Sequence, residues 1–206
     1  MVASSVVYTL ELAVEFKSPA DKFWEALKTW SSILPEVLPE TYKSIEVVED
    51  VDGEKNGSVT LWKMNPSTLI EGAPVMMEEK KKLGSVDEVT KTITYSVVGG
   101  DLLKLYKSYE PNFTLIPKIS TSASAENEGD DIDVVDDKVE EKDEMVGVGG
   151  GTVKWSVKYE KVNEMVPEPN MVKAMIFKTL LILDEHVLSK QNQVVETKKE
   201  IEMIAN

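Results

Sequence analysis

The stretch NMVKAMIFKTLLILDEHVLSK, residues 170–190, decides the fold because it is the longest segment with uninterrupted helical periodicity in the chain. Pro167 and Pro169 precede it and Asn170 is a suitable N-cap, so the start of the helix is well marked. All strand-like segments come earlier, so we expect this helix to pack across a completed sheet. Its apolar residues recur at helical spacing and predict one broad buried face: Val172, Met175, Ile176, Leu180, Leu183 and Val187.

Seven segments with strand-like alternation precede this helix. After the first strand, Ser18-Pro19 predicts a helix start with Ser18 as the cap, and two short helices follow. Six antiparallel strands come next, so the order predicts an α+β fold. The strand segments are residues 8–16, 44–49, 58–64, 76–83, 90–98, 107–116 and 152–159.

The composition narrows the class of protein. A chain of 206 residues that is 42% hydrophobic can bury one sizeable core, which favours a single domain over residues 1–190 with a polar C-terminal tail at 191–206. The absence of cysteine excludes disulfides and thiolate metal sites. The net charge is −14 and all 23 basic residues are lysine, which disfavours nucleic-acid binding. There is no signal-peptide pattern and no apolar run of ~18 residues, so we expect a cytoplasmic protein without a membrane span.

The segment 121–150 interrupts the last hairpin with eleven acidic residues and only two lysines. Such a segment cannot bury enough apolar surface to order itself, so the sequence predicts a disordered, solvated loop. A calcium site is the alternative, but the ligand spacing of a calcium-binding loop is absent. No metal site is therefore expected. A further hypothesis is that this acidic loop docks a basic protein partner.

Five segments in this order resemble the Bet v 1 and START-like family, in particular its major latex protein branch. They are KSPADKFWEAL at 17–27, NGSVTLWKM at 56–64, YSVVGGDLLKLYKSY at 95–109, GTVKWSVKYEKVNE from 151 and VPEPN ending at 170. The resemblance covers about residues 8–190 apart from the acidic segment. Most members of this family are shorter, and the acidic segment is not part of their pattern.

The resemblance implies a helix-grip fold, in which a curved seven-stranded antiparallel sheet wraps around the C-terminal helix with a large apolar cavity between them. It also implies binding of hydrophobic plant metabolites such as steroids, hormones, flavonoids, terpenoids or alkaloids, and a link to defence and stress responses. Some relatives catalyse condensation, cyclisation or isomerisation. The glycine-rich turn of the family remains only as Gly53 and Asn56-Gly57, without the lysine and hydroxyl of a nucleotide loop, so we expect a tight hairpin and no cofactor.

Strand alternation predicts which side chains face the long helix. The same pattern would also fit a filled core, but the tryptophans and tyrosines carry polar tips that need partners, and methionines adapt to irregular ligands. We therefore predict a ligand cavity. Its expected lining residues are Leu12, Val14, Leu27, Thr60, Trp62, Met64, Met76, Ile93, Tyr95, Tyr109, Phe113, Val153, Trp155, Met171, Met175, Thr179 and Leu183.

Catalytic residues are harder to assign. Glu78 shares the strand face of Met76 and would be a general acid or base if buried near Tyr95 or Tyr109, although we favour an exposed strand end, because unpaired buried acids are rare. Lys107 is a candidate Schiff-base lysine, although we favour the alternative, a solvated position at the rim. The single histidine, His186, is expected at the surface near the end of the helix, where it builds neither a zinc site nor a catalytic triad.

Two functions follow from this pattern. The first is a carrier or sensor for a hydrophobic small molecule. The alternative is a cofactor-free enzyme that performs acid–base cyclisation, isomerisation or condensation on a specialised metabolite. The sequence defines neither the ligand nor the oligomeric state.

Overall fold

A curved antiparallel sheet of seven strands forms the framework of the molecule in the computed structural model, which describes residues 6–51, 54–118 and 149–204. The strands lie in the order β1-β7-β6-β5-β4-β3-β2, so the first and last strands of the chain are neighbours. Each strand runs antiparallel to the next, which confirms the expected α+β architecture. The strands are β1 (Val7–Phe16), β2 (Tyr42–Val51), β3 (Glu54–Met64), β4 (Met77–Asp87), β5 (Thr92–Gly100), β6 (Tyr106–Pro117) and β7 (Gly151–Lys161).

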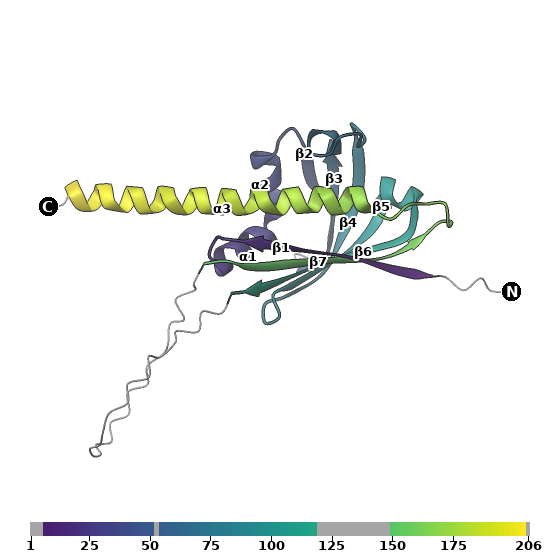
Figure 1. Cartoon of the computed structure of the whole chain (residues 1–206), viewed down its shortest axis with the longest axis horizontal. Helices are drawn as coiled ribbons and strands as arrows, with labels where there is room; N and C mark the ends of the chain where they lie inside the picture. The colour runs from purple at the N-terminus through teal and green to yellow at the C-terminus, as the bar shows by residue number, and fades with distance from the viewer. Residues whose placement is uncertain (1–5, 52–53, 119–148, 205–206) are drawn as a thin grey trace, which may run out of the picture.

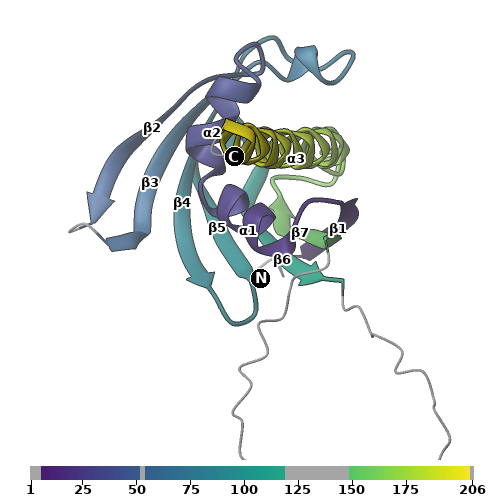
Figure 2. The same cartoon turned by 90° about the vertical axis from the view of Figure 1, so that its left-hand side faces the viewer.

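Three α-helices lie on the concave side of this sheet (Figures 1 and 2). The short helices α1 (Ala20–Lys28) and α2 (Trp30–Val37) connect β1 to β2, and the long helix α3 (Asn170–Ile204) runs across the sheet. Figure 2, which looks along α3, shows the sheet curving around the helix. Two 3₁₀ turns, η1 (Pro66–Thr68) and η2 (Asp101–Lys104), complete the structure.

The strand alternation places one apolar layer against α3. On β7 the odd-numbered residues Val153, Trp155, Val157 and Tyr159 are buried, and Lys154 and Lys158 between them are exposed. Trp155 pairs across the ladder with Phe113 on one side and Leu12 on the other. These cross-strand neighbours form a continuous apolar surface beneath the helix, because paired residues project from the same face of a sheet.

The start of α1 differs from the expected cap. The helix begins at Ala20, its N-cap is Pro19, and no side chain caps it. Ser18 is buried instead, and its backbone N–H donates to the carboxylate of Asp184 on α3. The prediction of a Ser18 cap was therefore wrong, because the long-range partner on α3 fixes this junction in place of a local side-chain bond.

The long helix extends past the expected end at Lys190. It continues to Ile204, beyond the edge of the sheet (Figure 1). The predicted acidic segment falls outside the described residues over 121–148, so the expectations about it stay predictions. The proposed division into one domain and a polar tail is likewise still a prediction.

Candidate functional site

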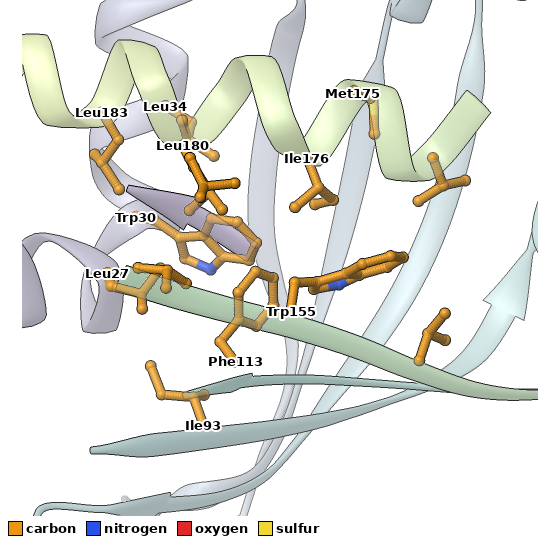
Figure 3. Close-up of a cluster of buried hydrophobic side chains, with 14 of the residues drawn as sticks. Leu27, Trp30, Leu34, Ile93, Phe113, Trp155, Met175, Ile176, Leu180 and Leu183 are labelled. Atoms are coloured by element: carbon orange, nitrogen blue, oxygen red, sulfur yellow. The ribbon is translucent and has the colours of Figure 1, made fainter. Parts of the chain in front are cut away.

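The space between α3 and the sheet is filled largely by aromatic side chains. Trp30 of α2 lies edge-on to Trp62 of β3, with ring centroids 5.3 Å apart, and to Phe113 of β6 at 4.9 Å. Figure 3 shows Trp30, Phe113 and Trp155 in this space, with Ile176 pointing toward them from α3. Trp30 is only 2% exposed, and its side chain fills the interior beside α2.

The structure brings most of the predicted lining residues into this interior. Leu12, Thr60, Tyr95 and Met171 are half-buried, the first three on strands of the sheet and the last near the start of α3. The following predicted residues are buried: Val14, Leu27, Trp62, Met64, Ile93, Tyr109, Phe113, Val153, Trp155, Met175, Thr179 and Leu183. Whether they contact a ligand stays a prediction.

The strand β4 presents the opposite face from the one expected. Met76 is 63% exposed and precedes the strand, so the prediction that it points inward was wrong. Glu78 is also exposed, as the interpretation of an exposed strand end predicted, and it is no acid or base for the interior. Met64 pairs with Met77 and Trp62 pairs with Glu79, so the register of β3 directs the neighbouring residues inward. The backbone N–H of Glu78 donates to Asp101, which fixes this end of the strand.

Lys107 does not reach the interior either. It is exposed on β6 between the buried residues Tyr106 and Tyr109. Its exposed position matches the solvated alternative and removes it as a Schiff-base candidate for an interior substrate.

The structure instead buries an ion pair that the sequence analysis missed. Glu79 is 2% exposed and Lys81 is 8% exposed, and the ammonium of Lys81 lies 3.1 Å from Oε2 of Glu79. The same ammonium lies 4.0 Å from the ring centroid of Trp62, a cation–π contact. The run MMEEKKK has charged residues on both strand faces, so its sequence does not show which face is buried. The pairing with β3 decides this.

A small hollow of about 20 Å³ remains beside this ion pair. A space of this size holds roughly one water molecule. It is lined from β4, β5, β6, β7, α2 and α3 by Trp30, Glu79, Lys81, Tyr95, Val97, Tyr109, Pro111, Phe113, Trp155, Val172 and Ile176. A hollow this small differs from the large cavity that the resemblance implied, because Trp30 and Phe113 occupy the space.

Three buried polar atoms on the lining residues have no hydrogen-bond partner within the part of the chain that the structure describes: Oε1 of Glu79, the hydroxyl of Tyr109 and Nε1 of Trp155. An unpartnered buried donor or acceptor costs about 1–3 kcal/mol, so native proteins leave few of them. Three around one hollow indicate that something with hydrogen-bonding capacity belongs there.

The tyrosines of the interior are neutral donors. Burial raises the pKa of Tyr95 to about 12, and a hydrogen bond from Nε1 of Trp30 at 3.2 Å partly opposes this shift. Burial likewise raises the pKa of Tyr109 well above its usual value, and the nearby carboxylate of Glu79 adds to the effect. Both phenols therefore stay protonated near neutral pH.

A larger, open groove of about 510 Å³ lies between α1, α2 and the second half of α3. His186 lines it, half-buried, and its Nε2 has no partner. Burial lowers the pKa of His186, with Lys190 adding to the effect. The prediction of a surface histidine favoured in its charged form by the helix end was wrong, because α3 continues well beyond it.

Other kinds of site find no support among the residues that the structure describes. Within residues 6–51, 54–118 and 149–204, no cluster of three or more His, Asp or Glu side chains could hold a metal ion. None of the described helices is long and apolar enough to cross a membrane.

The fold and the interior define a helix-grip protein, with a long helix held by a curved antiparallel sheet. The sequence model of the Pathogenesis-related protein Bet v 1 family matches residues 5–148, and the chain belongs to this family. Members of the family are known for binding hydrophobic ligands.

The similar curated proteins are major latex proteins. MLP-like protein 423 of Arabidopsis thaliana is 30% identical over 88% of this chain and 94% of its own length. Major latex protein 146 of Papaver somniferum is 29% identical over 81% of this chain and 82% of its own length.

Solved structures agree on the fold. Ginseng major latex-like protein 151 from Panax ginseng has a TM-score of 0.63 and 23% identity, and the match covers 88% of this chain and 98% of that one. Norcoclaurine synthase from Thalictrum flavum, in complex with dopamine and hydroxybenzaldehyde, has a TM-score of 0.56 and 18% identity, with 90% and 89% coverage.

Proposed function

We propose that this protein binds a hydrophobic small molecule between α3 and the sheet, as a carrier or sensor. The observation that carries the proposal is the hollow at the centre of the aromatic interior, where three polar atoms have no partner. Native proteins leave few buried polar atoms without a partner, so three of them around one hollow favour a position for a hydrogen-bonding group. The family's association with hydrophobic ligands supports the same function.

Binding of a molecule larger than water requires the interior to open. Trp30 is the side chain best placed to move, because it comes from a short helix and its indole makes one hydrogen bond, at 3.2 Å. The middle of α3 is held more firmly, since Asp184 accepts hydrogen bonds from the backbone of both Lys17 and Ser18. The described structure is therefore the closed form of the site in this proposal.

A fluorescent probe tests the proposal. N-phenyl-1-naphthylamine is neutral and apolar, and it should bind with a Kd below ~100 μM, about 5 kcal/mol or more of binding free energy. Ile176→Phe adds volume at the hollow and should weaken binding at least tenfold. Leu181→Phe is the matched control, because Leu181 lies on the same helix but is 37% exposed. Absence of probe binding, or equal affinities in the two variants, would overturn the proposal.

A second candidate is cofactor-free acid–base catalysis in the same interior. Glu79, Lys81 and Tyr109 place a carboxylate, an ammonium and a phenol around one hollow. Norcoclaurine synthase shares the fold and holds dopamine and hydroxybenzaldehyde in its structure. Incubation with these two compounds should give a condensation product that Glu79→Gln abolishes. An equal amount of product in wild type and variant would remove Glu79 from the reaction.

The remaining expectations are part of the proposal. The link to defence and stress responses follows the family's description as pathogenesis-related. The cytoplasmic location and the basic partner for the acidic segment stay predictions. Deletion of residues 122–149 with no change in the proteins that co-purify would argue against the partner.

A further inference from the structure

The three unpartnered atoms at the interior hollow differ in what they need. Oε1 of Glu79 only accepts hydrogen bonds, because its carboxylate is paired through Oε2 with Lys81. Nε1 of Trp155 only donates. The hydroxyl of Tyr109 donates or accepts. A group that satisfies all of them must donate at least once and accept at least once.

A hydroxyl group meets this requirement, since it carries one donor hydrogen and two acceptor lone pairs. It can donate to Glu79 and accept from Trp155 or Tyr109. A carbonyl or ether oxygen only accepts, so it would leave Glu79 without a partner. An ammonium group only donates, so it would leave Trp155 without one.

The charge of the site argues against an acidic ligand. Glu79 and Lys81 form a pair with no net charge, and Lys81 is the only lysine buried among the residues that the structure describes. A ligand carboxylate would enter beside the carboxylate of Glu79 without a free cation to pair with. Burial of an unpaired charge is strongly unfavourable.

The rest of the lining is apolar and flat-sided. Phe113, Val97, Val172 and Ile176 line the hollow beside the polar residues, and Trp30 lines it from α2. These side chains suit a rigid aromatic or alicyclic body, because such a body loses little conformational freedom on binding.

We infer that the ligand is a neutral molecule with a hydroxyl group on a rigid apolar body, and that the hydroxyl binds at Glu79, Tyr109 and Trp155. The inference rests on the proposed function, because it assumes that the interior opens for a ligand. The hollow, which has room for about one water molecule, is the position of the hydroxyl oxygen. A water molecule in this hollow would be displaced by the ligand hydroxyl.

Three naphthalenes that share one apolar body test the inference by calorimetry at neutral pH. 2-Naphthol carries the hydroxyl, 2-methylnaphthalene has no polar atom, and 2-naphthoate is an anion. We expect 2-naphthol to bind at least tenfold more tightly than either of the others, and 2-naphthoate to bind most weakly. The tenfold preference corresponds to about 1.4 kcal/mol.

Tyr109→Phe is the variant of choice because it removes only the unpartnered hydroxyl and keeps the ring, so the fold should be retained. It should weaken the binding of 2-naphthol at least threefold and leave the affinity for 2-methylnaphthalene unchanged. Tyr106→Phe is the matched control: Tyr106 is a buried neighbour on β6 whose hydroxyl donates to the carbonyl of Pro167 and does not line the hollow. It should leave the affinity for 2-naphthol unchanged.

The outcomes separate the two proposals. Equal affinity for 2-naphthol and 2-methylnaphthalene would overturn the hydroxyl inference and leave the hydrophobic site intact, with a buried water as the only partner of the polar atoms. Tightest binding of 2-naphthoate would overturn the inference in favour of an anion site. If none of the naphthalenes and no neutral probe binds, the proposed function itself fails.

Discussion

Asp184, near the middle of α3, accepts a hydrogen bond of 2.9 Å from the backbone N–H of Ser18, 166 residues earlier in the chain. Its other carboxylate oxygen accepts from the backbone N–H of Lys17, also at 2.9 Å. One buried side chain therefore ties the long helix to the junction of β1 and α1. The first half of α3 faces the interior hollow through Val172 and Ile176. We expect substitutions near Val172 and Ile176 to change binding and those near Asp184 to change stability.

Replacement of Asp184 tests this anchor. Asp184→Ala leaves two backbone N–H groups without acceptors, and hydrogen bonds to a charged group contribute about 1.5–3 kcal/mol each. We expect the free energy of unfolding to fall by about 2–4 kcal/mol in urea titrations. Glu185→Ala, at the exposed neighbouring position, should change it by less than about 0.5 kcal/mol. Equal effects of the two substitutions would show that Asp184 does not anchor the helix.

Tyr42 and Thr179 provide a second connection between α3 and the sheet. Their hydroxyl groups share a buried hydrogen bond of 2.8 Å. A double-mutant cycle with Tyr42→Phe and Thr179→Val should give a coupling energy of about 0.5–1.5 kcal/mol. Either single substitution already breaks the hydrogen bond, so the second one has no bond left to remove. Strict additivity in chemical denaturation would contradict the contact.

The buried ion pair predicts a strong asymmetry between adjacent lysines on β4. Lys81→Met leaves Glu79 buried without its cation and should lower the free energy of unfolding by about 3–5 kcal/mol. Lys80→Met, on the exposed face of the same strand, should have little effect. Similar melting temperatures for the two variants would contradict the buried ion pair, and a larger loss in Lys80→Met would mean that β4 has the opposite register.

Acid titration should report on Glu88, which follows β4. Hydrogen bonds from Lys28 at 2.7 Å and from Nε1 of Trp24 at 2.6 Å lower the pKa of its carboxyl to about 2. In the unfolded chain the pKa of Glu88 is near 4.5, so the unfolded state binds more protons between pH 4.5 and 2. The contribution of Glu88 to the free energy of unfolding is therefore complete above about pH 4.5 and is lost as the pH falls toward 2.

Urea midpoints of wild type and Glu88→Gln, measured from pH 7 to pH 2, check this titration. The difference between the two proteins should be largest above about pH 5 and should shrink as the pH approaches 2. Glu110→Gln, on the exposed face of β6, serves as the control. A difference that stays constant across this range would show that Glu88 does not titrate as the contacts require.

Much of the fold could be predicted from periodicity. The alternation on β7, with Trp155 between Val153 and Val157, has only one arrangement that buries its apolar face. The helix from Asn170 was recognised for the same reason. The face of β4 could not be predicted, because methionine, glutamate and lysine occur at both odd and even positions there. Its register depends on the pairing of Trp62 with Glu79, which is a tertiary contact.

The shape of the interior also lay beyond the sequence. Trp30 sits in a short helix whose packing angle decides whether its indole points outward or fills the cavity. The structure places it against Trp62 and Phe113, and the expected large cavity becomes a small hollow. The unpartnered atoms of Glu79, Tyr109 and Trp155 could not be predicted, because they depend on how β4, β6 and β7 pack in the folded protein.

The most direct test of ligand binding in the interior uses two residues as reporters in one NMR titration. Nε1–H of Trp155 reports on the interior hollow, and His186, the only histidine of the chain, reports on the open groove. Addition of 2-naphthol should shift the indole signal of Trp155, assigned by its loss in Trp155→Phe, and leave the imidazole signals of His186 in place. A shift of His186 with an unchanged Trp155 signal would contradict the account.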